Sequence, residues 1–261
     1  MFNRRTKLIL KNKTVKGVGQ SLGDEQLAIV DSFKFSFEKE TPKDLLLTFG
    51  DGTIDILTNN DAIDCFPVLK ILHGIYKIGK NFNTARLMKK TWAFLWNTQD
   101  FTQEQKRKFL KDFSDANQER GAEVLLDIIN RIENVNKIAV LCNLIKSRIA
   151  ECITIEELVR LVFILERVPI SELTKLYAYK ENHYVPGESE LLYASGLVYE
   201  AVLDRDNGSQ YALSANGRQL LKFGLGIDVE QNVIAKKEIP GTVWEDDIAV
   251  DEDIEQLFVK K

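Results

Sequence analysis

The stretch from Ser189 to Gly224 constrains the fold more than any other part of the chain. A short amphipathic segment ends at Gly196, and a run of alternating apolar and polar residues follows it. A turn-rich segment, residues 204–210, separates this run from a second apolar run that ends at Ser214. Period-two alternation predicts strands, and the Asp- and Gly-rich segment between them predicts a turn. The order of these elements therefore predicts a small module of helix, strand, turn, strand and helix.

Helix starts upstream extend this pattern. Thr154 and Glu157 form a capping box, and Pro169 opens a shorter helix. Helices, two strands joined by a wing and a closing helix resemble the winged helix-turn-helix superfamily over residues 154–224. The residues that carry the resemblance are Gly196-Leu197-Val198, the wing tip Asp206-Asn207-Gly208 and the run from Tyr211 to Arg218. By this resemblance, the residues of the wing surface are Arg205, Asn207 and Arg218.

The charge of this module decides between two kinds of partner. In winged helices that bind DNA, the helix before the strands enters the major groove and the wing contacts phosphates. Here that helix carries Glu188 and Glu190 and no basic residue before Gly196. Between Glu151 and Gly226, eleven acidic residues stand against seven basic ones, and carboxylates oppose phosphate binding. We therefore expect a winged helix that contacts proteins, with a DNA-binding transcription regulator as the alternative.

Residues 61–150 have the apolar periodicity of amphipathic helices. In the first of these helices, the predicted apolar face is Val68, Ile71, Leu72, Ile75 and Phe82, and the predicted polar face is Lys70, His73, Lys77 and Lys80. Asn83 or Thr84 is expected to cap the second helix, Thr102 and Gln105 form a capping box, and joints are expected at Gly121 and residues 134–136. The chain is therefore predicted to be mainly α, with a helical bundle at 61–150 and a winged helix with a small β-hairpin wing at 151–226. Residues 1–60 have no clean period, and residues 227–261 form an acidic tail.

No Asp or Glu occurs between Asp64 and Asp100, although the chain has 39 acidic residues. The basic residues inside this gap are Lys70, Lys77, Lys80, Arg86, Lys89 and Lys90, interspersed with aromatic side chains. One interpretation is two bundle helices whose lysines are solvated. The others are a surface for an acidic protein segment, for an anionic membrane or for a nucleic-acid backbone.

The acidic tail is a candidate occupant of that basic surface. Residues 227–261 contain ten acidic residues and four lysines, with apolar residues interspersed. Opposite charges attract, so the tail is expected to compete with outside partners and to make the protein self-inhibited. A chain that ends at Gly226 should then bind an anionic partner better than the full chain.

The residues that usually carry chemistry are sparse. The chain has two histidines, His73 and His183, and neither has metal-ligand spacing to another His or Cys. A column of carboxylates at four-residue spacing, Asp115, Glu119, Glu123 and Asp127, could bind a cation only on a continuous helix, which Gly121 is expected to interrupt. The sequence therefore predicts no catalytic residue, no metal and no cofactor.

The three cysteines, Cys65, Cys142 and Cys152, lie among apolar neighbours and are expected to be small buried thiols of a reducing cytoplasm. The net charge of −4 argues against a chain-wide nucleic-acid binder. The chain is expected to be a non-enzymatic cytoplasmic interaction protein with a protein partner. The alternatives are the DNA-binding regulator and an effector of a bacterial defence system that acts peripherally at the membrane surface.

Overall fold

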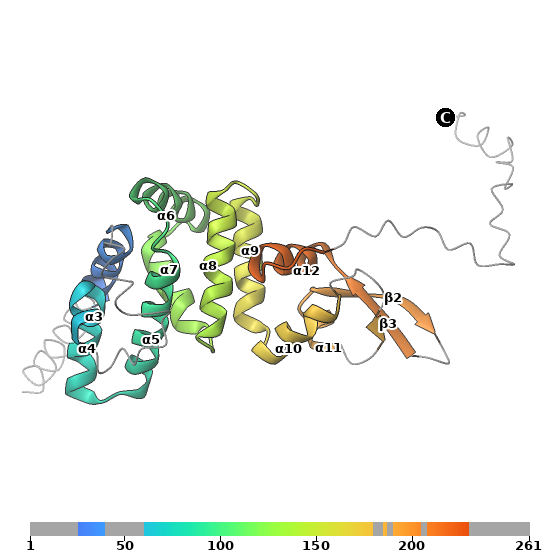
Figure 1. The fold of residues 1–261 in the computed structure, drawn as a ribbon, viewed down its shortest axis with the longest axis horizontal. Coiled ribbons are helices and arrows are strands. Elements are labelled where there is room, and N and C mark those ends of the chain that lie inside the picture. The colour runs from blue at the N-terminus through green and yellow to red at the C-terminus, as the bar shows by residue number, and fades with distance from the viewer. Residues whose placement is uncertain (1–25, 40–59, 180–184, 187–189, 205–207, 230–261) are drawn as a thin grey trace, which may run out of the picture. The chain divides into compact units, whose positions relative to one another are not determined.

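The computed structural model describes residues 26–39, 60–179, 185–186, 190–204 and 208–229. Within these ranges the protein is mainly helical and has a small antiparallel sheet (Figure 1). The mainly α prediction is confirmed. The wing residues Arg205 and Asn207, the loop histidine His183 and the acidic tail beyond residue 229 lie outside the described residues.

A helix at residues 26–38 precedes the predicted bundle. Its Phe33 and Phe37 are fully buried, and their rings lie 5.8 and 5.3 Å from the ring of Phe94. The sequence interpretation found no clean period here. Val30, Phe33 and Phe37 nevertheless recur at three- and four-residue steps, which is the signal that identifies this helix.

The helices that follow are α3 (Asn60–Cys65), α4 (Pro67–Gly79), α5 (Phe82–Asn97), α6 (Gln103–Asn117), α7 (Gly121–Arg131) and α8 (Asn136–Ile149). The breaks fall at the predicted joints, because α6 ends just before Gly121 and α7 ends just before residues 134–136. The capping box of Thr102 and Gln105 is present at the start of α6. Local chemistry therefore sets the helix ends in this region.

The C-terminal elements are α9 (Ile155–Arg167), α10 (Ile170–Lys175), a 3₁₀ turn (Leu176–Tyr179), β1 (Val185–Pro186), α11 (Glu190–Ala194), β2 (Val198–Asp204), β3 (Gly208–Leu213), α12 (Ala215–Gln219) and a π turn (Leu220–Gly224). The capping box of Thr154 and Glu157 opens α9 as predicted. The short strand β1 lies before the alternating pattern from which the two strands were predicted. Its two residues pair with Tyr211 and Gln210 of β3.

The sheet has the strand order β1-β3-β2, with both pairings antiparallel. The β2–β3 register runs from Val198 opposite Leu213 to Asp204 opposite Gly208, with one irregularity after Glu200. The two strands that the alternating pattern predicted are thus present in the predicted order.

One hydrophobic core joins α8 and α9 to the last turn of the described chain. Leu220 and Leu221 are fully buried, and Asn143 of α8 donates its side-chain N–H to the carbonyl of Gly224 at 2.9 Å. A Cβ atom at Gly224 would lie 2.9 Å from Val140 Cγ1, so the turn packs closely on α8. No helix in these described ranges combines the length and apolar character needed to cross a bilayer.

Candidate functional site

Helices α4 and α5 form a hairpin with a short turn (Figure 1). Pro67 stands in the first turn of α4, and Lys80 ends the helix in the left-handed conformation, with φ 44°. Asn81 then caps α5, because its Oδ1 accepts the N–H of Asn83 at 2.9 Å. The predicted caps, Asn83 and Thr84, were therefore wrong. Once the left-handed Lys80 turns the chain, Asn81 is the extended residue whose side chain reaches the first N–H groups of the helix.

The buried face of α4 differs from the predicted one. Val68, Leu69 and Leu72 are buried, as a helix face should be, but His73 is buried beside them and Ile75 is exposed. Apolar residues occur on more than one side of this helix, so periodicity alone did not identify the side that faces the core. Burial lowers the pKa of His73, and the charge of Lys77 lowers it further against the opposing effect of Asp64.

The hairpin exposes large apolar side chains at its turn. Ile78 is 91% exposed and Phe82 is 71% exposed, on either side of Lys80 and Asn81, and Ile75 is 38% exposed one turn earlier. We call Ile75, Lys77, Ile78, Lys80 and Phe82 the hairpin tip. The sequence interpretation assigned Ile75 and Phe82 to the core. The signal against that assignment is their position beside the Gly79-Lys80-Asn81 turn, where a helix pair ends.

Five of the predicted surface cations are exposed, and they divide into groups. Lys70 and Lys77 line one groove with His73 and Gly74, and Lys70 forms an ion pair with Asp64 at 3.2 Å. Lys80 lies in the turn, and Arg86 and Lys89 lie on α5.

Arg86 is the cation that ties the hairpin to its neighbours. It donates a hydrogen bond to the carbonyl oxygen of Glu133 at 2.6 Å, and its guanidinium lies 5.7 Å from the ring centroid of Phe82. Lys77 and Lys80 form no ion pair with another described residue, so they present their charge to solvent.

Lys90 does not belong to this surface, and its prediction as a surface cation was wrong. Its side chain is buried, with 6% exposed, and Nζ donates to the carbonyl oxygens of Asn130 and Ile132 at the end of α7. Cations stabilise the carbonyl end of a helix, which explains why a lysine is held there. Burial, helped by the nearby charge of Arg86, lowers the pKa of Lys90 to about 8.

A second apolar surface lies between α9 and α11. Phe163 is 51% exposed and Leu191 is 54% exposed, and both line a cavity of about 240 Å³ that also contains Arg167. The guanidinium of Arg167 lies 3.7 Å from the ring centroid of Phe163. We call Phe163, Arg167 and Leu191 the α9–α11 groove. The sequence interpretation did not find this surface, because its residues are distant along the chain.

The C-terminal elements are also a candidate DNA-binding surface, which needs exposed basic side chains. Arg218, which the resemblance assigned to the wing surface, lies in α12. Its Nη1–H donates a hydrogen bond to the carbonyl oxygen of Leu213 at 3.0 Å. Helix α11 exposes Glu190, Leu191 and Tyr193. The side chains on the outer face of α11 are therefore acidic and apolar.

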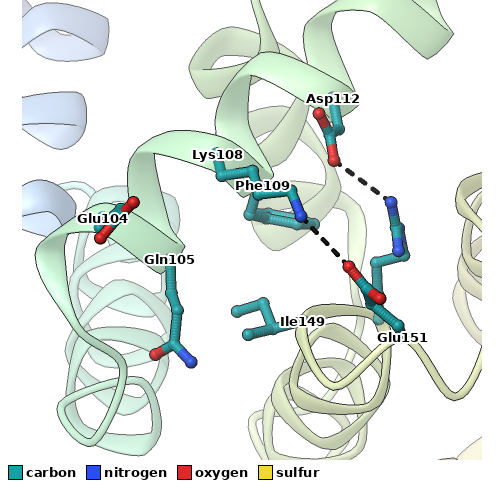
Figure 2. A pocket seen from close by; sticks show the side chains of 8 residues that line it. Glu104, Gln105, Lys108, Phe109, Asp112, Ile149 and Glu151 are labelled. Carbon is teal, nitrogen blue, oxygen red and sulfur yellow. Dashed lines mark hydrogen bonds and ion pairs between the residues drawn. The ribbon is translucent and has the colours of Figure 1, made fainter.

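A small pocket of about 180 Å³ separates α6 from the end of α8, and its charges are paired. The ion pairs are Lys108–Glu151, which Figure 2 shows, and Arg148–Asp112, each with an N–O distance of 3.2 Å. These ion pairs join α6 to the last turn of α8 and to the turn that follows it. A salt-bridged pair at a surface contributes only about 0–1 kcal/mol, and the apolar lining residues are Phe109, which is buried, and Ile149, which packs partly buried against the core.

Metal ligands do not gather in the described part of the chain, where no group of three or more His, Cys, Asp or Glu side chains could hold an ion. The carboxylate column is interrupted, since α6 ends at Asn117 and α7 begins at Gly121. Asp115 thus belongs to α6, Glu123 and Asp127 belong to α7, and Glu119 lies between the two helices.

The prediction of buried thiols holds for one cysteine only. Cys142 is buried and burial raises its pKa, Cys65 is half-buried, and Cys152 is exposed in the turn between α8 and α9. Ile153, the next residue, is buried, whereas Cys152 itself is exposed in the turn.

The chain gives no significant match to a protein-family model, to a curated protein or to a solved structure.

Proposed function

We propose that the protein is a non-enzymatic, cytoplasmic interaction protein whose α4–α5 hairpin binds an anionic partner. The observation that carries this proposal is the exposure of Ile78 and Phe82 beside Lys77 and Lys80. Exposed large apolar groups next to cations favour a surface that becomes covered. Burying one such side chain contributes about 1.5–3 kcal/mol to a complex, and the cations supply attraction and orientation.

We further propose that the C-terminal elements form a winged helix that contacts protein. The order α9, α10, α11, β2, β3 and α12 supports the winged helix. The α9–α11 groove supports a protein partner, because aromatic residues and arginine are enriched in protein interfaces. The acidic and apolar outer face of α11 disfavours the DNA-binding alternative.

Retention on a heparin column at low salt tests the hairpin proposal. Heparin presents dense negative charge without an apolar phase, so it reports the cations alone. The full chain should be retained, and the variant Lys77→Glu/Lys80→Glu should elute at clearly lower salt. Lys146→Glu, a change at an exposed lysine of α8, is the matched control and should elute close to wild type. Equal elution of the hairpin variant and the control would refute the proposal.

Self-inhibition by the acidic tail belongs to the same proposal. A chain that ends at Gly226 should elute from heparin at higher salt than the full chain, because the tail no longer competes for Lys77 and Lys80. Earlier or identical elution would refute self-inhibition and leave the hairpin proposal intact.

A gel shift with random duplex at low salt distinguishes the DNA-binding alternative. Under the present proposal, Arg218→Ala leaves any residual shift unchanged. A strong shift by wild type that Arg218→Ala removes would favour the transcription regulator.

A further inference from the structure

We infer that the anionic partner of the α4–α5 hairpin is a lipid bilayer, and that the hairpin tip inserts into its headgroup region. This inference rests on the proposed function and names its partner. The site would take acidic phospholipid headgroups around the cations and the upper acyl region around the apolar side chains.

The apolar part of the tip protrudes. Ile78 occupies the last turn of α4 and Phe82 the first position of α5, so both stand where the two helices end. Ile78 is 91% exposed and Phe82 is 71% exposed, and the Arg86 guanidinium lies 5.7 Å from the Phe82 ring centroid. Single exposed apolar residues are ordinary on protein surfaces, but here two stand four residues apart at one turn beside cations. A protruding wedge fits a fluid interface, which deforms around it, better than a preformed groove.

If Ile78 and Phe82 enter the bilayer, the basic residues of the hairpin lie at the depth of the lipid headgroups. At 1.5 Å per helical residue, Arg86 and Lys89 lie about 6 and 10 Å along α5 from Phe82. Lys77 directly precedes Ile78, and Lys80 follows it two residues later. All four therefore lie within about one Debye length of the tip, where basic residues are attracted to an anionic leaflet. Lys70 lies about 12 Å along α4 from Ile78 and pairs with Asp64, so it contributes less.

Other anionic partners fit this surface less well. Nucleic acid would leave Ile78 in water, since bases stack on aromatic side chains and an aliphatic one offers no such platform. An acidic protein segment would need its own pocket for the protruding Ile78 and Phe82. The polar Asn81 and Asn83, exposed at the same turn, limit insertion to the interface.

Co-sedimentation of the full-length protein with vesicles tests the inference. Vesicles of phosphatidylcholine mixed with phosphatidylserine should bind wild type, and pure phosphatidylcholine vesicles should bind it weakly. Ile78→Ser/Phe82→Ser should lower the partition coefficient by about tenfold or more, since each side chain loses its transfer from water. Lys77→Glu/Lys80→Glu should lower it by roughly thirtyfold or more on anionic vesicles, because loss of the two cations accounts for about thirtyfold and the added carboxylates lower it further. Phe35→Ser and Lys146→Glu are controls at exposed positions outside both proposed binding surfaces and should bind like wild type.

Fluorescence gives a second reading that does not depend on affinity. In Phe82→Trp, subtracting the fluorescence emission spectrum of wild type leaves the emission of the new tryptophan. This emission should shift to shorter wavelength when anionic vesicles are added, because the indole leaves water. Retention of Ile78→Ser/Phe82→Ser on heparin at the wild-type salt concentration shows that this variant is folded and keeps its cations.

The two proposals fail in different ways. If wild type binds heparin but not anionic vesicles, or if Ile78→Ser/Phe82→Ser binds vesicles like wild type, the bilayer inference is overturned. The hairpin proposal then stands, and its partner is a protein or a nucleic acid. If wild type binds neither heparin nor vesicles, both proposals are overturned.

Discussion

Gly121 lies against the backbone of α6, and replacing it by alanine tests the packing of α6 on α7. A Cβ atom at this position would lie 2.5 Å from the carbonyl oxygen of Leu110 and 3.0 Å from the amide nitrogen of Ser114. Both atoms belong to the backbone of α6, so no side-chain rotation relieves the clash. Gly74 provides the opposite case, because a Cβ atom there meets no atom within 4 Å.

The magnitude follows from the geometry. A carbon–oxygen contact needs about 3.3 Å, so Gly121→Ala must move the two helices apart by roughly 0.8 Å. Overpacking of this kind costs about 1–3 kcal/mol. The helix propensity of alanine exceeds that of glycine by about 1 kcal/mol in a helix interior. Gly121 is the first residue of α7, so Gly121→Ala receives little of this stabilisation. Gly74 lies in the middle of α4, so Gly74→Ala should receive nearly all of this stabilisation.

Urea unfolding followed by circular dichroism measures both variants. Gly121→Ala should lower the free energy of unfolding by about 1–3 kcal/mol, and Gly74→Ala should raise it by about 1 kcal/mol. For a domain of this size, each kcal/mol corresponds to about 2–4 °C in Tm. An unchanged m-value would show that stability alone differs. If Gly121→Ala proves as stable as wild type, the close approach of α6 and α7 is wrong.

Four further predictions follow from buried and capped groups. With its pKa lowered to about 8 in the fold against 10.5 when unfolded, Lys90 binds fewer protons in the folded state between these pH values. Wild-type stability should therefore rise by roughly 1–3 kcal/mol from pH 8 to 10.5 relative to Lys90→Met; parallel pH profiles would contradict this. A thiol reagent should label Cys152 in the native protein and Cys142 only after unfolding; early loss of both thiols would contradict their assigned burial. Thr154→Ala should destabilise by about 1 kcal/mol through loss of the capping box. Because hydrogen bonds from Thr154 and Gln219 lower the pKa of Glu157, the stability that this carboxylate adds should be lost as pH falls through its folded pKa; a flat acid limb in calorimetry would count against it.

The candidate site was predictable in its composition and not in its geometry. The acid-free stretch between Asp64 and Asp100 identified the hairpin. The contribution of Ile78 and Phe82 became visible only when the turn and the buried face of α4 were known. The apolar residues of α4 satisfy a helical period on more than one side, so pattern alone could not separate core from surface.

The sequence by itself determined the local features of this protein. Both capping boxes, the joints between helices and the order of the strands depend on side chains within a few residues of one another, so their chemistry is complete in the sequence. Tertiary structure decided burial. Lys90 reads as one more exposed cation until α7 brings carbonyl groups 40 and 42 residues away within reach of its amine. The helix at residues 26–38 likewise has its place because Phe33 and Phe37 meet Phe94, more than fifty residues further along the chain. Burial is a property of the neighbours that a residue acquires on folding, and those neighbours are distant in sequence.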